Sequence, residues 1–233
     1  MAISHGKGTS VLVSSSDLSG YFTSADCSQS VETAETTAFG NASKSYITGL
    51  RDGTASLSGM WDGAASAVDS VLASALAGSG LPVTIGQAGL SAGNRCQLML
   101  AHETSYGVTA AVADVVQVSA DLQSSAGLWS GIYLRSVTAE TASTNGTSVD
   151  NAASSSNGLR ANLHVTAGSG SATIKVQHST DNSTWVDLIT FTAATGATAE
   201  HKTVTGTVNR YLRAISTISG GSPSFTYTVS VAR

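Results

Sequence analysis

Residues 224–232 read "SFTYTVSVA", and their side chains alternate without a break between apolar and small polar. The apolar positions are Phe225, Tyr227, Val229 and Val231, with Ser or Thr between them. A two-residue period places successive side chains on opposite faces of a β-strand. This stretch therefore predicts a half-buried strand near the end of the chain.

Patterns of the same kind recur through most of the sequence. "NRCQLMLAHE" (94–103) alternates, and "GVTAAVADVVQVSADL" (107–122) is rich in β-branched residues with one interruption at Asp114. The turn "STDNST" (179–184) predicts a hairpin, because Asp, Asn and Ser favour tight turns. In the last third of the chain we expect six strands, near 159–167, 172–179, 185–192, 201–206, 209–217 and 224–232. The expected fold class is all-β.

One segment departs from the two-residue period. In "WDGAASAVDSVLASALAGSG" (61–80) the larger apolar side chains recur at helical spacing, at Val68, Val71, Leu72 and Leu76. We expect one flanking helix at about 64–77, with Asp62 capping its start and Gly78 ending it. An alanine-rich loop is the alternative.

The expected division of the chain follows from composition. Residues 138–158 hold almost no apolar side chain larger than alanine, which is typical of a linker or a long excursion. We therefore expect a β-barrel or sandwich with the helix over 1–137, a linker over 138–158, and a small β-sandwich over 159–233.

Charge and cysteine content exclude several classes of protein. The net charge is −4, and residues 1–137 carry five Lys or Arg against ten Asp or Glu, so tight binding to phosphates is not expected. Two cysteines, Cys27 and Cys96, are too few for a disulfide framework and are expected to be buried free thiols.

No apolar run approaches the roughly 20 residues of a membrane span. The first residues lack a secretion signal pattern, so we expect synthesis in a cytoplasm.

No catalytic or metal-binding motif is found. The sequence contains no phosphate loop of the form GxxxxGK[ST] and no GxSxG elbow, and its five histidines are not spaced as metal ligands. Glu32 and Glu35 are three residues apart and could act as a carboxylate pair, although solvated or interface charges are the simpler interpretation. We expect no enzyme activity, no cofactor and no metal.

The segment "SVETAETTAFGNASKSYITGLRDG" (30–53) is loop-like in composition, yet it carries large apolar side chains and charges of both signs. The longer run 31–63 resembles the major tail tube proteins of long-tailed, siphovirus-like bacteriophages. The matching elements are "TTAFG" (36–40), Lys44 and Tyr46, "GLRDG" (49–53) and "SLSGMWDG" (56–63). "GVTAAVADVVQVSADLQSSAG" (107–127) is similar to the same family, so the resemblance covers roughly residues 10–135.

The resemblance implies a structural virion protein that polymerises into stacked, hexameric rings forming the tail tube. DNA passes through the lumen without tight binding. The partners implied are copies of the chain and other tail proteins: the tape measure, the terminator and the distal tail protein. The protein would be made in the host bacterial cytoplasm and reside in the virion tail. The subunit-interface residues would then be Glu32, Glu35, Phe39, Lys44, Tyr46, Ile47, Leu50, Arg51 and Asp52.

An alternative is a surface module that recognises host carbohydrate through residues 159–233. Trp185 follows a polar turn, where an exposed indole could stack on a sugar ring, and Tyr211 could lie on the same surface. An indole that closes the core of the sandwich is the simpler interpretation of Trp185. The sequence leaves open the ring symmetry and which residues line the lumen.

Overall fold

The computed structural model describes residues 5–76 and 78–233. Strands account for 63% of the chain and helices for 5%, which confirms the all-β class with one helix. The strands form a single antiparallel sheet of 13 strands. Their bounds are β1 Ser10–Val13, β2 Ser16–Asp17, β3 Phe22–Glu35, β4 Tyr46–Met60, β5 Leu81–Gly86, β6 Arg95–Thr109, β7 Gln117–Glu140, β8 Thr144–Asn145, β9 Val149–Asp150, β10 Leu159–Ser179, β11 Val186–Thr190, β12 Thr198–Val204 and β13 Tyr211–Ala232.

The first half of the chain builds one core around β5, β6 and the start of β7. Strand order runs β7-β6-β5-β1-β2, and β4 pairs with the other edge of β7 at its beginning. Helix α1 (Val68–Ala75) covers this core with the buried side chains of Val68 and Leu72. Burying these apolar side chains stabilises the folded state by about 1.5–3 kcal/mol each.

The helix is shorter than expected. Asp62 accepts a hydrogen bond from the backbone of Ala64, so it caps the turn before α1 and not the helix itself. Leu76 lies beyond the last helical residue and is exposed. Gly78 donates to the Ala75 carbonyl, which closes the C-terminal end as expected, while Ala77 lies outside the described residues.

The second half of the chain is a two-layer arrangement built from two long bent strands. β10 and β13 pair along their whole length, with register shifts on both sides of Ala167–Ser169. The expected strands 159–167 and 172–179 are therefore one strand, as are 209–217 and 224–232. The hairpin at 179–184 is confirmed, with Asp181 accepting hydrogen bonds from the backbone of Ser183 and Thr184.

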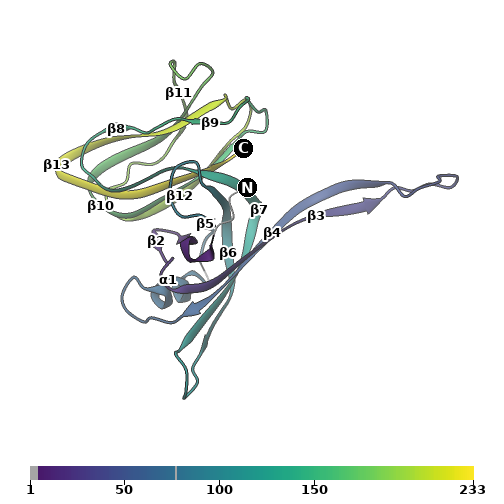
Figure 1. Cartoon of the computed structure of the whole chain (residues 1–233), viewed down its shortest axis with the longest axis horizontal. Helices are drawn as coiled ribbons and strands as arrows, with labels where there is room; N and C mark the ends of the chain where they lie inside the picture. Colours follow the sequence, from purple (N-terminus) through teal and green to yellow (C-terminus); the bar gives the residue numbers. More distant parts are fainter. Residues whose placement is uncertain (1–4, 77) are drawn as a thin grey trace.

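The two halves meet along β7 and β13. β7 continues past residue 137 to Glu140, and β8 and β9, which fall within the expected linker, pair with β13. Each half has its own core cluster of buried apolar residues. Figure 1 shows the second half, which includes β12, above the first half, with the long β3–β4 hairpin projecting to one side.

From residue 227 to residue 232 the strand is buried on both faces, not on one. Its apolar side chains fill the core of the second half, and Thr228 and Ser230 on the opposite face are also buried. That second face packs against the first half of the chain through hydrogen bonds between the hydroxyls of Ser230 and Thr84 and between those of Thr228 and Ser136. Thr228 and Ser230 therefore belong to a contact surface and do not face solvent, whereas Ser224 and Thr226 are half-exposed.

A buried polar cluster links the halves around His164. Its Nδ1 lies 2.7 Å from the Ser14 carbonyl oxygen, which only accepts, so Nδ1 carries the proton. Nε2 is then an acceptor and receives the Thr84 hydroxyl at 2.8 Å, while Thr84 lies 2.9 Å from the Ser230 hydroxyl. Asn162 donates to the Val83 carbonyl at 2.9 Å. Each of these bonds joins a residue of the first half to a residue of the second.

Both cysteines are free thiols, as expected. Cys96 is buried and Cys27 is half-buried, and burial raises the pKa of each thiol, to about 12 and about 11 respectively. Thiols with pKa values this high remain protonated and unreactive at neutral pH.

We expect the stability of the chain to fall on acidification through His164. Burial lowers the pKa of His164 from 6.5 to about 4, so the folded state binds this proton less tightly than the unfolded chain. Its contribution is complete above pH 6.5 and is lost as the pH falls towards 4, by about 3 kcal/mol. Urea unfolding of wild type and His164→Gln between pH 7.5 and 4.5 measures the difference, with His102→Gln as an exposed-site control. Parallel profiles for wild type and His164→Gln would contradict this assignment.

Glu103 is expected to act in the opposite direction. The side chain is 5% exposed, both carboxylate oxygens lack a partner among the described residues, and burial raises its pKa from 4.5 to about 7. Stability from Glu103 is therefore greatest below pH 4.5 and is lost as the pH rises through 7. Glu103→Gln, which cannot ionise, should exceed wild type by about 3 kcal/mol at pH 8 and match it at pH 4.5. Equal unfolding free energies at pH 8 would show that the carboxylate is solvated.

Candidate subunit interface

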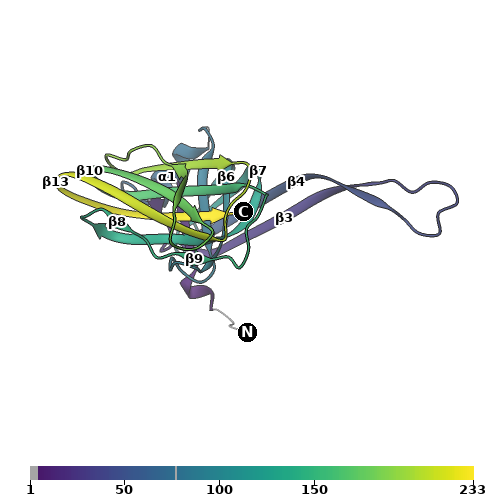
Figure 2. The same ribbon diagram turned by 90° about the horizontal axis from the view of Figure 1, so that it is seen from above.

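The hairpin of β3 and β4 forms an arm that leaves the body of the molecule. The part of β4 from Thr54 to Gly59 pairs with both β3 and β7, whereas the part before it pairs with β3 alone. The arm beyond that point is a two-stranded ribbon, and both views show it extending away from the rest of the chain (Figures 1 and 2). Isolated two-stranded ribbons are at best marginally stable in water.

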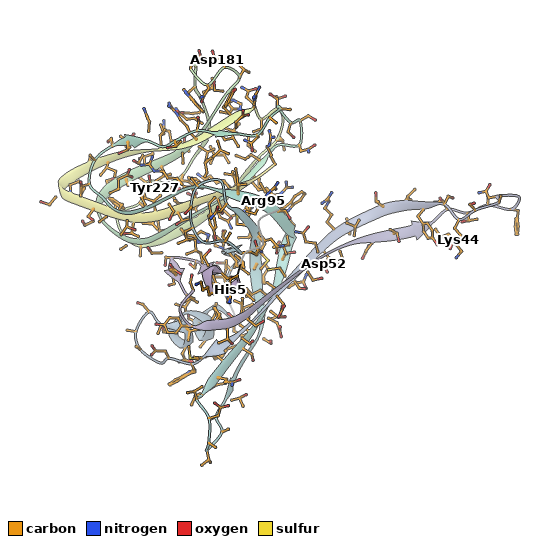
Figure 3. All side chains as sticks on the ribbon, in the orientation of Figure 1. His5, Lys44, Asp52, Arg95, Asp181 and Tyr227 are labelled. Atoms are coloured by element: carbon orange, nitrogen blue, oxygen red, sulfur yellow. The ribbon has the colours of Figure 1, made fainter. Side chains whose placement is uncertain are left out.

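Gly53 sits where the arm leaves the body. A side chain at this position would overlap Leu128 on β7, so only glycine lets β4 cross β7 this closely. Asp52, the preceding residue, is held at the root of the arm by the Gln123 side chain. Figure 3 shows Asp52 at this root and Lys44 towards the distal end of the arm.

The arm exposes the apolar side chains that the sequence singled out. Phe39 is 110% exposed, Leu50 76%, Ile47 59% and Tyr46 54%. On the same strand, Leu57 is 1% exposed, because the inner part of β4 packs into the first core. The four exposed side chains have no place to pack within the described chain.

The charged residues of the arm have different surroundings. Lys44 and Glu35 form a salt bridge of 3.2 Å with each other near the tip. Arg51 lies against the Trp129 ring, at 5.0 Å from its centroid. The structure therefore engages Glu35, Lys44, Arg51 and Asp52 within the chain. Glu32 packs beside Gly49 and forms no salt bridge with any described residue.

A second projecting hairpin is not predicted by the sequence pattern. The stretch 107–122, expected to be one strand with an interruption, is two strands with a turn at 110–116. Val108, Val112 and Val115 are 48%, 111% and 59% exposed around this turn. The β-branched valines on both sides of the turn make the whole stretch look like one strand. Asp114 is the only residue in the sequence pattern that indicates a turn.

The candidate carbohydrate residues lie elsewhere and are covered by arginines. The guanidinium of Arg213 lies 4.2 Å from the ring centroid of Trp185, and that of Arg210 lies 4.9 Å from that of Tyr211. Trp185 is half-buried, with one ring face used in this contact. No arrangement of the two rings as a sugar platform follows from these contacts.

Metal-binding and membrane-spanning features are absent from the part of the chain that the structure describes. Among residues 5–76 and 78–233 no group of three His, Cys, Asp or Glu side chains is placed to hold a metal ion. Within the same ranges no helix is long and apolar enough to cross a membrane.

Comparison with known proteins identifies solved structures that are similar to part or most of this chain. No protein-family description matches the chain, and no curated protein matches it. A chain of the virion of a native gene transfer agent particle has 13% identity and a TM-score of 0.45, covering 54% of this chain and 97% of that one. The tube-terminating cap of the anti-feeding prophage has 14% identity and a TM-score of 0.45, covering 57% and 93%.

A third structure is similar over a greater length. The Dit protein of phage SPP1, described as a hub of the adsorption apparatus, has 13% identity and a TM-score of 0.38, covering 96% of this chain and 98% of that one. At these TM-scores and identities the similarities do not establish a family or a function for the chain.

The arm should contribute little to the stability of the isolated chain. We expect Leu50→Ala to change the free energy of unfolding by less than about 0.5 kcal/mol, because its side chain is exposed. Leu57→Ala, the same substitution at a buried position of the same strand, should cost about 2–5 kcal/mol. Urea denaturation of both variants tests this. A large loss in Leu50→Ala would show that the arm packs on the body in solution.

Proposed function

We propose that this chain is a major tail tube subunit, a structural virion protein that polymerises into stacked hexameric rings around a DNA-conducting lumen. The observation that carries the proposal is the projecting arm with four large apolar side chains exposed. Exposed apolar groups on a protruding element mark an interaction site. Copies of the same chain supply the missing contacts if each arm packs on a neighbouring subunit.

Two of the sequence elements that resemble tail tube proteins lie in the arm. "TTAFG" (36–40) is at its tip, and "GLRDG" (49–53) leads into its root. The implied role of a long hairpin in that family is to reach the next ring. The large apolar and charged side chains of residues 30–53 would then make contacts only in the assembled tube. These side chains are Glu32, Phe39, Tyr46, Ile47 and Leu50.

The charge distribution supports a lumen that does not hold DNA. Residues 1–137 carry twice as many acidic as basic residues, so this half repels a polyanion. A weakly repelling wall lets DNA slide during ejection. We assign this half to the tube and the half over 159–233 to a sandwich that decorates or completes the tube wall. The tape measure, terminator and distal tail proteins are the partners this role requires.

Polymerisation of the purified chain tests the proposal. At high protein concentration, negative-stain electron microscopy should show six-membered rings or hollow tubes. Ile47→Ser combined with Leu50→Ser should keep the circular dichroism of wild type but lose the polymers, because it removes apolar contacts made only between subunits. Val186→Ser, at an exposed apolar position outside the arm, serves as the matched control.

Two results would count against the proposal. One is a wild-type chain that stays monomeric at every concentration. The other is an arm variant that forms polymers at the same concentration as wild type.

A further inference from the structure

Two arginines from distant parts of the sequence stack on Trp129. Trp129 lies on β7, with its indole N–H donating to the Ala126 carbonyl at 2.8 Å. The guanidinium carbon of Arg160, from β10, is 3.6 Å from the ring centroid, and that of Arg51, from the root of the arm, is 5.0 Å away. We call these three residues the Arg–Trp–Arg stack. It gathers two positive charges and an aromatic surface where the arm, β7 and β10 meet.

No negative charge compensates this stack within the described chain. Neither Arg51 nor Arg160 forms a salt bridge with any residue among 5–76 and 78–233. Burial, and secondarily the positive charge of Arg51, lowers the pKa of Arg160. Two neighbouring guanidiniums without a counter-charge favour a bound anion, and carboxylates match the planar fork of arginine.

The projecting β6–β7 hairpin carries the complementary features. From Cys96 to Leu134 the chain has three carboxylates and neither Lys nor Arg. Two of the three are engaged or buried: Asp121 accepts from Ser56 and Ser105, and Glu103 is enclosed in the core. The third, Asp114, lies at the exposed turn and forms no salt bridge with a described residue.

Asp114 is surrounded by apolar surface. Val112 and Val115, on either side of it, are exposed, and Asp114 Oδ1 accepts from the Val115 backbone at 2.7 Å, which fixes the turn. The hairpin tip thus presents one anion among apolar side chains. The Arg–Trp–Arg stack presents cations beside an aromatic ring, so the two surfaces match in both charge and polarity.

The tip cannot reach the stack of its own chain. Trp129 lies twelve residues beyond Gln117, the first residue of β7, and a strand rises about 3.3 Å per residue, so roughly 35–40 Å separate the two along β7. Only another copy can bring a tip to the stack. Such a contact joins different surfaces of the two copies, and repeated contacts of this type close into rings or extend into filaments.

We propose that the β6–β7 tip of one subunit docks on the Arg–Trp–Arg stack of the next, with Asp114 bound between the guanidiniums of Arg51 and Arg160. The exposed valines around Asp114 cover the Trp129 ring and exclude water from the ion pairs. This inference rests on the proposed self-assembly and names a contact that propagates it. It is separate from the contacts proposed for Phe39 at the tip of the arm.

Charge reversal on each side tests the docking. Asp114→Lys and Arg160→Asp should each raise the protein concentration needed for assembly by at least about tenfold, measured by sedimentation and electron microscopy, because each places like charges together. Mixed in equal amounts, the two variants should assemble again within about threefold of wild type. When the two variants alternate, the assembly has two kinds of contact. In one, the lysine at the tip of the Asp114→Lys variant meets the aspartate in the stack of the Arg160→Asp variant. In the other, the native Asp114 of the Arg160→Asp variant meets the native Arg160 of the Asp114→Lys variant.

The controls separate this contact from general effects. Asp26→Lys makes the same charge change at another exposed position and should assemble as wild type does. Arg160 is half-buried, so its substitution could disturb the fold, and circular dichroism of Arg160→Asp must match that of wild type. If it does not, Arg51→Asp, at an exposed position, takes the place of Arg160→Asp in the mixing experiment.

The outcomes distinguish the two proposals. Suppose that wild type forms polymers, but the single variants assemble as well as wild type or their mixture does not assemble. Either result would overturn the docking contact and leave the proposed tube function standing. A wild type that never assembles would overturn both.

Discussion

The backbone ladder of β7 holds the molecule together. Its first residues pair with β4 and β6, its middle with β6, and its last with β13, within one strand of 24 residues. Since a strand has only two edges, each partner takes a different stretch of β7. The arm, the first core and the C-terminal sandwich are therefore fixed to one another by main-chain hydrogen bonds, which do not depend on particular side chains.

Side chains then make this junction specific. His164, Thr84, Asn162 and Ser230 form a buried cluster in which the position of each proton follows from its neighbours. Unpaired polar groups in such a place would be costly, so the two halves fit in one arrangement. In the proposed assembly, such a rigid junction would hold the two projecting hairpins where they can meet neighbouring copies at defined places.

The sequence predicts most strongly where one face of a strand packs into a core. Alternation at 224–232 and the apolar stripe of α1 follow directly from burial, and both elements are present. The arm gives no such signal, because neither face of a two-stranded ribbon is buried, and its composition is that of a loop with unusual side chains. The glycine-rich bends of β10 and β13 look like chain turns, yet pairing continues through them. The Arg–Trp–Arg stack depends on three strands that meet only in the folded chain, so no local pattern could indicate it.

Because few residues of the chain are charged, each charged group has a large influence on how copies of the chain can associate. Only 11% of residues are charged, and most acids in the second half are engaged in ion pairs or turn caps. A surface of Ser, Thr, Ala and Gly can be buried against a copy of itself with little desolvation of charge. Two copies that associate through such a surface have few specific contacts that would fix their alignment. Asp114 on one hairpin and Arg51 and Arg160 beside Trp129 are among the charges that form no salt bridge in the described chain. In the proposed assembly, their opposite signs and apolar surroundings would select one alignment of neighbouring subunits.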